Sequence, residues 1–308
     1  MSYEDFKKRI YQELSNNVQA DVTLEHKTVR KNNGVVLDTI VLHSKAEQLS
    51  SCLYLNHYYE KYKHGTTEVE IIEEMLNVAN ESKGEVEQQL LITSEITDFS
   101  KLSDFICYKL VNAKMNEELV KTVPHKKFLD LAIIYYVICN IERDGIGTIL
   151  IQNSFFEEWD CSLEELHEKA VENTMRILPA QVRSMEEVII EMMGRDEEVL
   201  ESSGVSPNMY VVSNRKNLQG AGVILYPNLL RDFFHGLKET ARGLIILPSS
   251  VHEQIIIPYT EHMEVDSLRK MVKEINSTQV AREEVLSENI YVYSDKDDTI
   301  FLADGQEL

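Results

Sequence analysis

The most apolar stretch of the chain is Leu129–Cys139, where β-branched, aliphatic and aromatic residues follow one another without regular polar positions. Such a run predicts a strand that is covered on both faces. The polar segment Glu142–Gly147 supplies two glycines, so it predicts a hairpin loop before a second strand at Thr148–Gln152.

Two helices are predicted to follow this hairpin. A short helix starts at Asn153 and ends near Trp159. Ser162 then precedes Glu165 by three positions, which is the sequence of a capping box, and it predicts a helix over Leu163–Thr174. The central stretch is therefore read as a β-hairpin followed by two helices.

The start of the chain has the same plan, after an amphipathic helix over Tyr3–Leu14. The turn Asn32-Asn33-Gly34 joins two predicted strands, Asp21–Val29 and Val35–His43. Two predicted helices follow, at Leu53–Lys63 and Thr67–Asn80. Aromatic and acidic residues match in spacing between the two stretches, which indicates a duplicated hairpin–helix–helix module. Chance likeness between amphipathic helices explains the match equally well, and both interpretations stay open.

The segments around the central stretch predict further short elements. They are a strand at Asp104–Val111, a helix at Asn112–Val123 and a helix at Ala180–Arg195, followed by an acidic connector at Asp196–Asn208. The last third predicts strands at Met209–Ser213, Ala221–Tyr226, Gly243–Leu247 and Glu253–Pro258, helices at Pro227–Gly236 and Val265–Ile275, and a closing hairpin of Ile290–Tyr293 and Thr299–Leu302.

Hairpins interleaved with helices favour an α+β fold of antiparallel β-hairpins with packed helices over a doubly wound parallel sheet. A chain of 308 residues with 43% apolar residues has room for several modules. We expect an N-terminal hairpin–helix module at 1–98, a central hairpin–helix module at 99–200 and a C-terminal α+β module at 201–308.

The chain is strongly acidic, with 52 Asp and Glu against 31 Lys and Arg and a net charge of -21. This charge repels nucleic-acid phosphates and anionic lipid, so no direct nucleic-acid or membrane partner is expected. Solvated surface explains most of the acid, and a nucleic-acid mimic that presents its carboxylates to a DNA-binding protein is an alternative.

The four cysteines are far apart in the sequence and form no CxxC pair, so they favour reduced thiols over a disulfide framework or a zinc site. The N-terminus is charged and amphipathic without the apolar core of a secretory signal, and no window reaches the length of a membrane span. These features predict a cytoplasmic protein.

Two pairs of residues could carry chemistry. His125 precedes the apolar strand and Asp130 lies at the start of that strand. A hydrogen bond between the two side chains would fix the His125 imidazole in one tautomer, in which it could act as a base or as a metal ligand. His252-Glu253 resembles half of a zinc-protease helix, but Ile256 stands where the second histidine would be and the segment predicts a strand. For both pairs the sequence favours a structural role, and the chemical role stays open as an alternative.

Other polar clusters have simpler explanations. Asp295, Asp297 and Asp298 lie on a tight turn without the glycine and terminal glutamate of a calcium loop, which predicts a solvated turn. No phosphate-binding loop, dinucleotide fingerprint, nucleophile elbow or HExxH motif occurs. We therefore predict no metal and no cofactor.

Four blocks of the sequence resemble a family of bacterial proteins known only as a domain of unknown function and common in anaerobic gut-type Gram-positive bacteria. They are NNGVVLDTIVL, KLVNAKMNEELVKTVPHKKFLDLAIIYYVI, WDCSLEELHEKAVENT and ILPSSVHEQIIIPY. The resemblance spans Phe6 to Tyr293, and a more distant one to a second uncharacterised bacterial family rests on the DLAIIYY strand. Neither implies an activity or a catalytic residue.

The leading hypothesis is therefore a non-enzymatic interaction or regulatory protein with another protein as its partner and an open oligomeric state. The competing hypothesis is a small hydrolase or metal-dependent enzyme that uses His125, Asp130, His252 and Glu253. It requires these four side chains to converge in one pocket.

Overall fold

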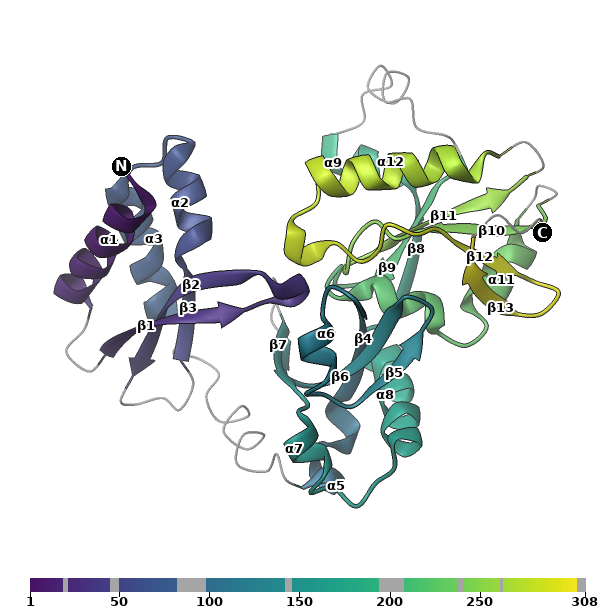
Figure 1. Cartoon of the computed structure of the whole chain (residues 1–308), viewed down its shortest axis with the longest axis horizontal. Helices are drawn as coiled ribbons and strands as arrows, with labels where there is room; N and C mark the ends of the chain where they lie inside the picture. The colour runs from purple at the N-terminus through teal and green to yellow at the C-terminus, as the bar shows by residue number, and fades with distance from the viewer. Residues whose placement is uncertain are drawn as a thin grey trace. The chain divides into compact units, whose positions relative to one another are not determined.

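The computed structural model describes residues 1–18, 22–44, 50–81, 98–141, 146–193, 208–237, 241–260 and 263–303. The chain divides into two compact units, the N-terminal unit (Met1–Ile96) and the C-terminal unit (Thr97–Leu308). Both units combine helices with antiparallel sheets (Figure 1), so the predicted α+β fold is confirmed. Most of the expected acidic connector at 196–208 lies outside the described residues, as does Asp304.

The N-terminal unit is a three-stranded sheet of order β1-β2-β3 on which three helices pack (Figure 1). Its elements are α1 (Tyr3–Asn17), β1 (Val22–Arg30), β2 (Val36–Ser44), β3 (Ser50–Tyr54), α2 (Leu55–Lys63) and α3 (Glu68–Glu81). The turn between β1 and β2 is the short 3-10 segment η1 (Asn32–Gly34), in which Asn33 and Gly34 have φ of 57° and 69°. Asn and Gly tolerate this left-handed backbone, which confirms the predicted turn.

One face of α1 forms the core of this unit. Phe6, Ile10 and Leu14 recur every four residues, so they lie on one side of the helix, and all three are fully buried. They pack in one cluster with Ile71 and Met75 of α3. Because this face points inward, the two flanks of α1 are left for other contacts.

The C-terminal unit contains a four-stranded sheet in which β6 (Leu131–Ile141) pairs with the three other strands. The pairing strands are β4 (Ile106–Asn112), β5 (His125–Phe128) and β7 (Ile146–Leu150). Every residue of β6 from Leu131 to Ile138 is buried, as predicted for an apolar strand covered on both faces.

Short helices and one long helix surround this sheet. They are α5 (Phe99–Leu102), η3 (Ser103–Phe105), α6 (Glu117–Val120), α7 (Asn153–Phe156) and α8 (Leu163–Ile177). The predicted capping box opens α8, because the Ser162 hydroxyl accepts from the backbone N–H of Glu165 while the Glu165 carboxylate accepts from the backbone N–H of Ser162. α8 packs against β4.

A six-stranded sheet of order β13-β12-β10-β11-β9-β8 forms the rest of the unit. Its strands are β8 (Ala180–Ser184), β9 (Tyr210–Asn214), β10 (Gly243–Leu247), β11 (Gln254–Tyr259), β12 (Tyr291–Ser294) and β13 (Thr299–Leu302). The helical elements are α9 (Met185–Met193), η4 (Gly220–Leu225), α11 (Leu229–Gly236), α12 (Val265–Thr278) and η5 (Arg282–Glu284).

Buried side chains tie the two sheets together through backbone carbonyls. The Tyr108 hydroxyl on β4 donates to the Gly222 carbonyl of η4 at 2.9 Å, and the Asn112 amide donates to the Leu286 carbonyl at 2.9 Å. In return, the Tyr226 hydroxyl donates to the Leu178 carbonyl after α8 at 2.7 Å. These bonds make one unit of elements that lie far apart in the sequence.

Several predicted elements are wrong. Ala221–Tyr226 was expected as a strand and forms η4, a 3-10 segment, because a short apolar run does not distinguish a strand from a buried helix. The helix expected over Ala180–Arg195 begins five residues later, since Ala180–Ser184 pairs with β9 as β8. The helix expected over Asn112–Val123 is reduced to α6. Strands β3 and β5 were not expected.

Strand β8 lies in the expected central module and pairs with β9 of the expected C-terminal module. Both modules share the C-terminal unit. Strand order differs between the three-stranded and four-stranded sheets, and duplication of a hairpin–helix–helix module stays a prediction.

Candidate functional site

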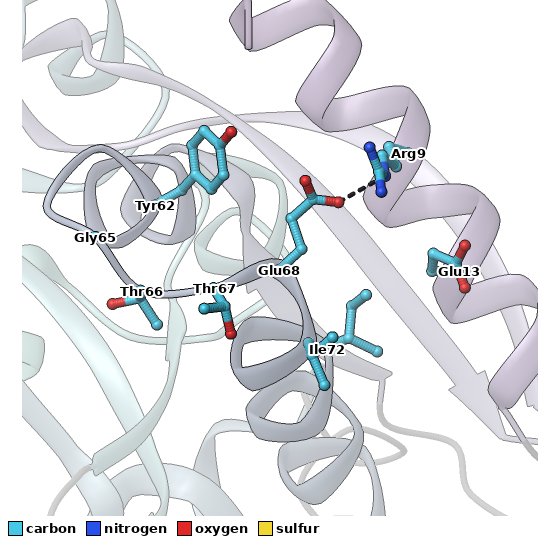
Figure 2. Close-up of a pocket in the computed structure, with 9 residues that line it drawn as sticks. Arg9, Glu13, Tyr62, Gly65, Thr66, Thr67, Glu68 and Ile72 are labelled. Carbon is cyan, nitrogen blue, oxygen red and sulfur yellow. Dashed lines mark ion pairs between the residues drawn. The ribbon is translucent and has the colours of Figure 1, made fainter.

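The N-terminal unit contains an open groove of about 630 Å³ between α1 and the start of α3 (Figure 2), which we call the α1–α3 groove. The turn that joins α2 to α3 closes one end. Its lining residues are Arg9, Glu13, Tyr62, Gly65, Thr66, Thr67, Glu68, Val69 and Ile72.

Two carboxylates and one guanidinium face this groove. Arg9 Nε lies 2.6 Å from Glu68 Oε2, and Figure 2 shows the Glu68 carboxylate between Tyr62 and Arg9. Glu13 follows Arg9 by one helical turn on α1 and makes no ion pair with any described residue. The groove therefore carries more negative than positive charge.

Val69, Ile72 and the Tyr62 ring give the α1–α3 groove its apolar surface. Val69 is 65% exposed, which is the highest exposed fraction among the large apolar side chains in the described part of the chain. Ile72 is half-buried one turn further along α3. Tyr62 packs its ring against Phe6 and Tyr59, with ring centroids 5.5 Å and 6.1 Å apart, so the phenol is held firmly in place.

The N-terminus of α3 does not offer the groove a free anion site. The Glu70 carboxylate accepts from the backbone N–H and the hydroxyl of Thr67, both at 2.8 Å, and the Thr67 hydroxyl accepts from the Glu70 backbone N–H at 3.3 Å. The hydrogen bond from the backbone N–H of Thr67 has the largest effect on the pKa of Glu70, and the bond from its hydroxyl has the next largest; together they keep this pKa below its ordinary value. This capping box and Glu68 already satisfy the helix dipole.

A second recess of about 490 Å³ opens on the other flank of α1, beside β1, and we call it the α1–β1 recess. Lys7 and His26 line it, and both face Asp38, with Lys7 Nζ at 3.0 Å and His26 Nε2 at 3.4 Å from the carboxylate. Burial on its own would raise the pKa of Asp38. Hydrogen bonds to its carboxylate, of which the one from Lys7 is the strongest, outweigh this effect and keep the pKa below its ordinary value. The Lys7 cation is thus already neutralised.

The structure does not bring His125 and Asp130 together. His125 is exposed at the far end of β5, opposite Ile134, and its Nδ1 lies 3.1 Å from the Val123 carbonyl oxygen. Asp130 lies in the β5–β6 turn and accepts hydrogen bonds from Ser287, Asn289 and Tyr291. The hydrogen bond that would have fixed the His125 tautomer through Asp130 does not form in the structure.

His252 and Glu253 lie in the turn between β10 and β11. His252 Nδ1 accepts from the backbone N–H of Gln219 at 3.2 Å, and its Nε2 lies 3.6 Å from Glu284 Oε1. Glu253 accepts a long hydrogen bond of 3.4 Å from the Ser249 hydroxyl. The Gln219 contact fixes the tautomer with the proton on Nε2.

All four of these residues lie in the described part of the chain, and no hydrogen bond or ion pair joins the His125–Asp130 pair to the His252–Glu253 pair. The segment Glu284–Tyr291 contacts His252 at one end and Asp130 at the other. A catalytic role for the four residues stays a prediction.

The acidic turn at the C-terminal hairpin forms as expected between β12 and β13. Two of its three carboxylates hold α11: Asp298 pairs with Arg231 at 2.6 Å and Asp295 pairs with His235 at 2.8 Å. The turn thus has a structural role. Among the residues that the structure describes, no group of three or more His, Cys, Asp and Glu side chains could hold a metal ion.

Sequence reasoning missed the α1–α3 groove. The only local signal is the pair Arg9 and Glu13, which lie four residues apart beside the buried Phe6–Ile10–Leu14 face. The rest of the groove comes from α2, α3 and the turn between them, which only the folded chain brings next to α1.

The model of a family of unknown function (DUF5688) matches residues 3–295. No curated protein matches, and no solved structure does. None of the helices in the described ranges is long and apolar enough to cross a membrane.

Proposed function

Because this chain belongs to a family of unknown function, we propose its function from its own geometry: it is a non-enzymatic interaction protein that binds a basic segment of another protein in the α1–α3 groove. The segment carries arginine or lysine beside an apolar side chain. The proposed place of action is the cytosol.

The observation that carries this proposal is the combination of charge and apolar surface in the α1–α3 groove. Glu13 and Glu68 outnumber Arg9, so the groove attracts a cation. Val69 and Ile72 lie beside these carboxylates and would bury an apolar side chain of the same segment. A basic and apolar segment matches both features.

The charge of the whole chain supports a basic partner. At a net charge of -21, long-range attraction raises the rate at which a positively charged protein meets this one, and salt screens it. The groove then supplies the local contacts that hold one segment in place.

A titration with defined peptides tests the proposal. Two fluorescein-labelled peptides of twelve residues alternate leucine with either arginine or glutamate, and their anisotropy is followed as the full-length protein is added. We expect the arginine peptide to bind with Kd on the order of tens of micromolar and the glutamate peptide not to bind.

Variants identify the groove as the binding site. Glu13→Gln and Glu68→Gln remove one carboxylate each and should weaken binding of the arginine peptide by roughly three- to tenfold. Glu158→Gln makes the same change at an exposed position of the C-terminal unit and should leave binding unchanged. Equal weakening by all three variants would show that net charge alone attracts the peptide, against the proposal.

A further inference from the structure

We propose that Arg9 is an internal competitor that occupies the acidic side of the α1–α3 groove until a partner's arginine displaces it. This inference rests on the proposed function and adds a regulatory contact to the same groove. It starts from the observation that the groove already binds a guanidinium, the one that its own helix α1 supplies.

The two partners of this ion pair differ in exposure. Arg9 has a side chain that is 62% exposed, whereas the Glu68 side chain is 21% exposed and belongs to the first turn of α3. The carboxylate is therefore part of the groove wall, and the N-terminus of α3 stabilises its charge whether or not Arg9 is present. Figure 2 shows the guanidinium reaching from α1 to the Glu68 carboxylate, and because the Arg9 side chain is 62% exposed it can turn into solvent.

Displacement of Arg9 costs little. Ion pairs whose cation is exposed contribute little to stability, because water solvates the freed guanidinium almost as well and the long side chain regains rotamer freedom. A partner arginine that packs an apolar neighbour on Val69 and Ile72 gains contacts that Arg9 on its own helix does not provide. The partner therefore replaces Arg9 at Glu68.

The position of Arg9 also indicates the chemistry of the ligand. A planar guanidinium can donate two parallel hydrogen bonds to one carboxylate, which an ammonium group cannot do. Tyr62 lies beside Glu68 and offers an aromatic ring on which a guanidinium stacks. We therefore expect arginine to be preferred over lysine in the bound segment.

Removal of Arg9 tests the inference because it should strengthen binding, whereas loss of an ordinary contact weakens it. We expect Arg9→Ala and Arg9→Gln to lower the Kd of the arginine peptide by about two- to fivefold, the range expected for loss of an exposed ion pair. Arg9→Gln keeps most of the side-chain stem, so it separates loss of charge from loss of packing. A matched lysine peptide should bind more weakly than the arginine peptide.

Lys8→Ala is the matched control, since it removes a positive charge from the adjacent, exposed position of α1 outside the groove. It should change Kd much less than Arg9→Ala. Equal tightening by both variants would mean that only net charge matters, and weaker binding by Arg9→Ala would mean that Arg9 itself contacts the partner. Either result would contradict the role of Arg9 as an internal competitor and would leave the proposed binding of a basic peptide unaffected. Failure of the wild-type protein to bind the peptide overturns the proposed function as well.

Discussion

The Ser287 hydroxyl donates a hydrogen bond of 2.6 Å to Asp130 Oδ2, although 157 positions separate the two residues. The Asn289 amide donates to the same oxygen at 3.0 Å, and the Tyr291 hydroxyl donates to Oδ1 at 2.9 Å. Ser287 and Tyr291 are fully buried. One carboxylate therefore joins the turn of the four-stranded sheet to the segment that leads into β12.

We expect Asp130→Ala to destabilise the C-terminal unit by about 3 kcal/mol, because it leaves two buried hydroxyls without their acceptor. Urea unfolding followed by the fluorescence of Trp159 measures this change. Trp159 is the single tryptophan of the chain and lies in the C-terminal unit, so it reports on that unit. Asp130→Asn keeps one acceptor oxygen and should cost less; equal losses would contradict the role of the carboxylate.

Gly220→Ala should destabilise the same unit by about 2 kcal/mol or more. A Cβ atom at this position would lie 2.5 Å from the His252 carbonyl oxygen and 2.8 Å from the backbone nitrogen of Asn214, and backbone atoms cannot move aside easily. Gly236→Ala is the control, since nothing lies within 4 Å of a Cβ atom there. Trp159 fluorescence in urea should separate the two variants.

The stability of the C-terminal unit should fall as pH falls below about 6.5, in part because of His167. Burial lowers the pKa of His167, and the Lys126 cation lowers it further. At a pH below 6.5, the ordinary pKa of histidine, His167 is protonated in the unfolded chain but still neutral in the folded chain. Because the unfolded state binds more protons, a fall in pH lowers the free energy of unfolding. His167 Nδ1 lies 3.1 Å from the Tyr135 hydroxyl oxygen. In the tautomer with the proton on Nε2, Nδ1 accepts from this hydroxyl, and protonation would remove that acceptor.

The pH dependence is measured by urea unfolding at intervals from pH 8 to pH 5. His167→Gln cannot titrate, so its stability should change less than that of the wild type over this range. A wild-type curve and a variant curve with the same slope would show that other groups cause the loss.

The cysteines should differ in reactivity toward Ellman's reagent at pH 8. Burial raises the pKa of Cys107 and of Cys139 to about 11, and it also raises that of Cys161. Cys52 is exposed. We expect one fast thiol in the folded protein, at least about tenfold faster than the others, and four in denaturant.

Cys52→Ser should abolish the fast reaction, and Cys161→Ser should leave it unchanged. A fast reaction that survives Cys52→Ser would place the reactive thiol elsewhere.

Local patterns were sufficient to predict the elements with strong signals. The β6 strand was predicted because aliphatic, aromatic and cysteine residues follow one another from Leu131 to Cys139, and α8 because Ser162 and Glu165 form its capping box. The start of α9 has a similar signal that was missed. The backbone N–H of Ser184 donates to the Glu187 carboxylate at 3.0 Å, and the backbone N–H of Glu187 donates to the Ser184 hydroxyl at 3.1 Å. This capping box in the sequence SMEE marks the end of β8 and the start of the helix.

Contacts between distant segments could not be predicted. The sequence offered His125, five positions away, as one possible partner of Asp130, whereas its hydrogen-bond partners lie near residue 290. η4 has a strand-like sequence, and its close packing beneath Tyr108 depends on Gly222, where a Cβ atom would lie 2.9 Å from the ring. The α1–α3 groove needs three elements at once. A single sequence does not show which distant segments contact one another.

The division of strands between the sheets has a consequence for folding during synthesis on the ribosome. The three strands and three helices of the N-terminal unit are contiguous in the chain, so this unit has all of its partners once about a third of the protein has emerged. The strands β4, β5, β6 and β7 emerge next and can pair with one another, but Asp130 then waits for Ser287 and Tyr291, and β8 waits for β9. The contacts between the four-stranded and six-stranded sheets thus form only near the end of translation, and until then the surfaces that they bury are open to a chaperone.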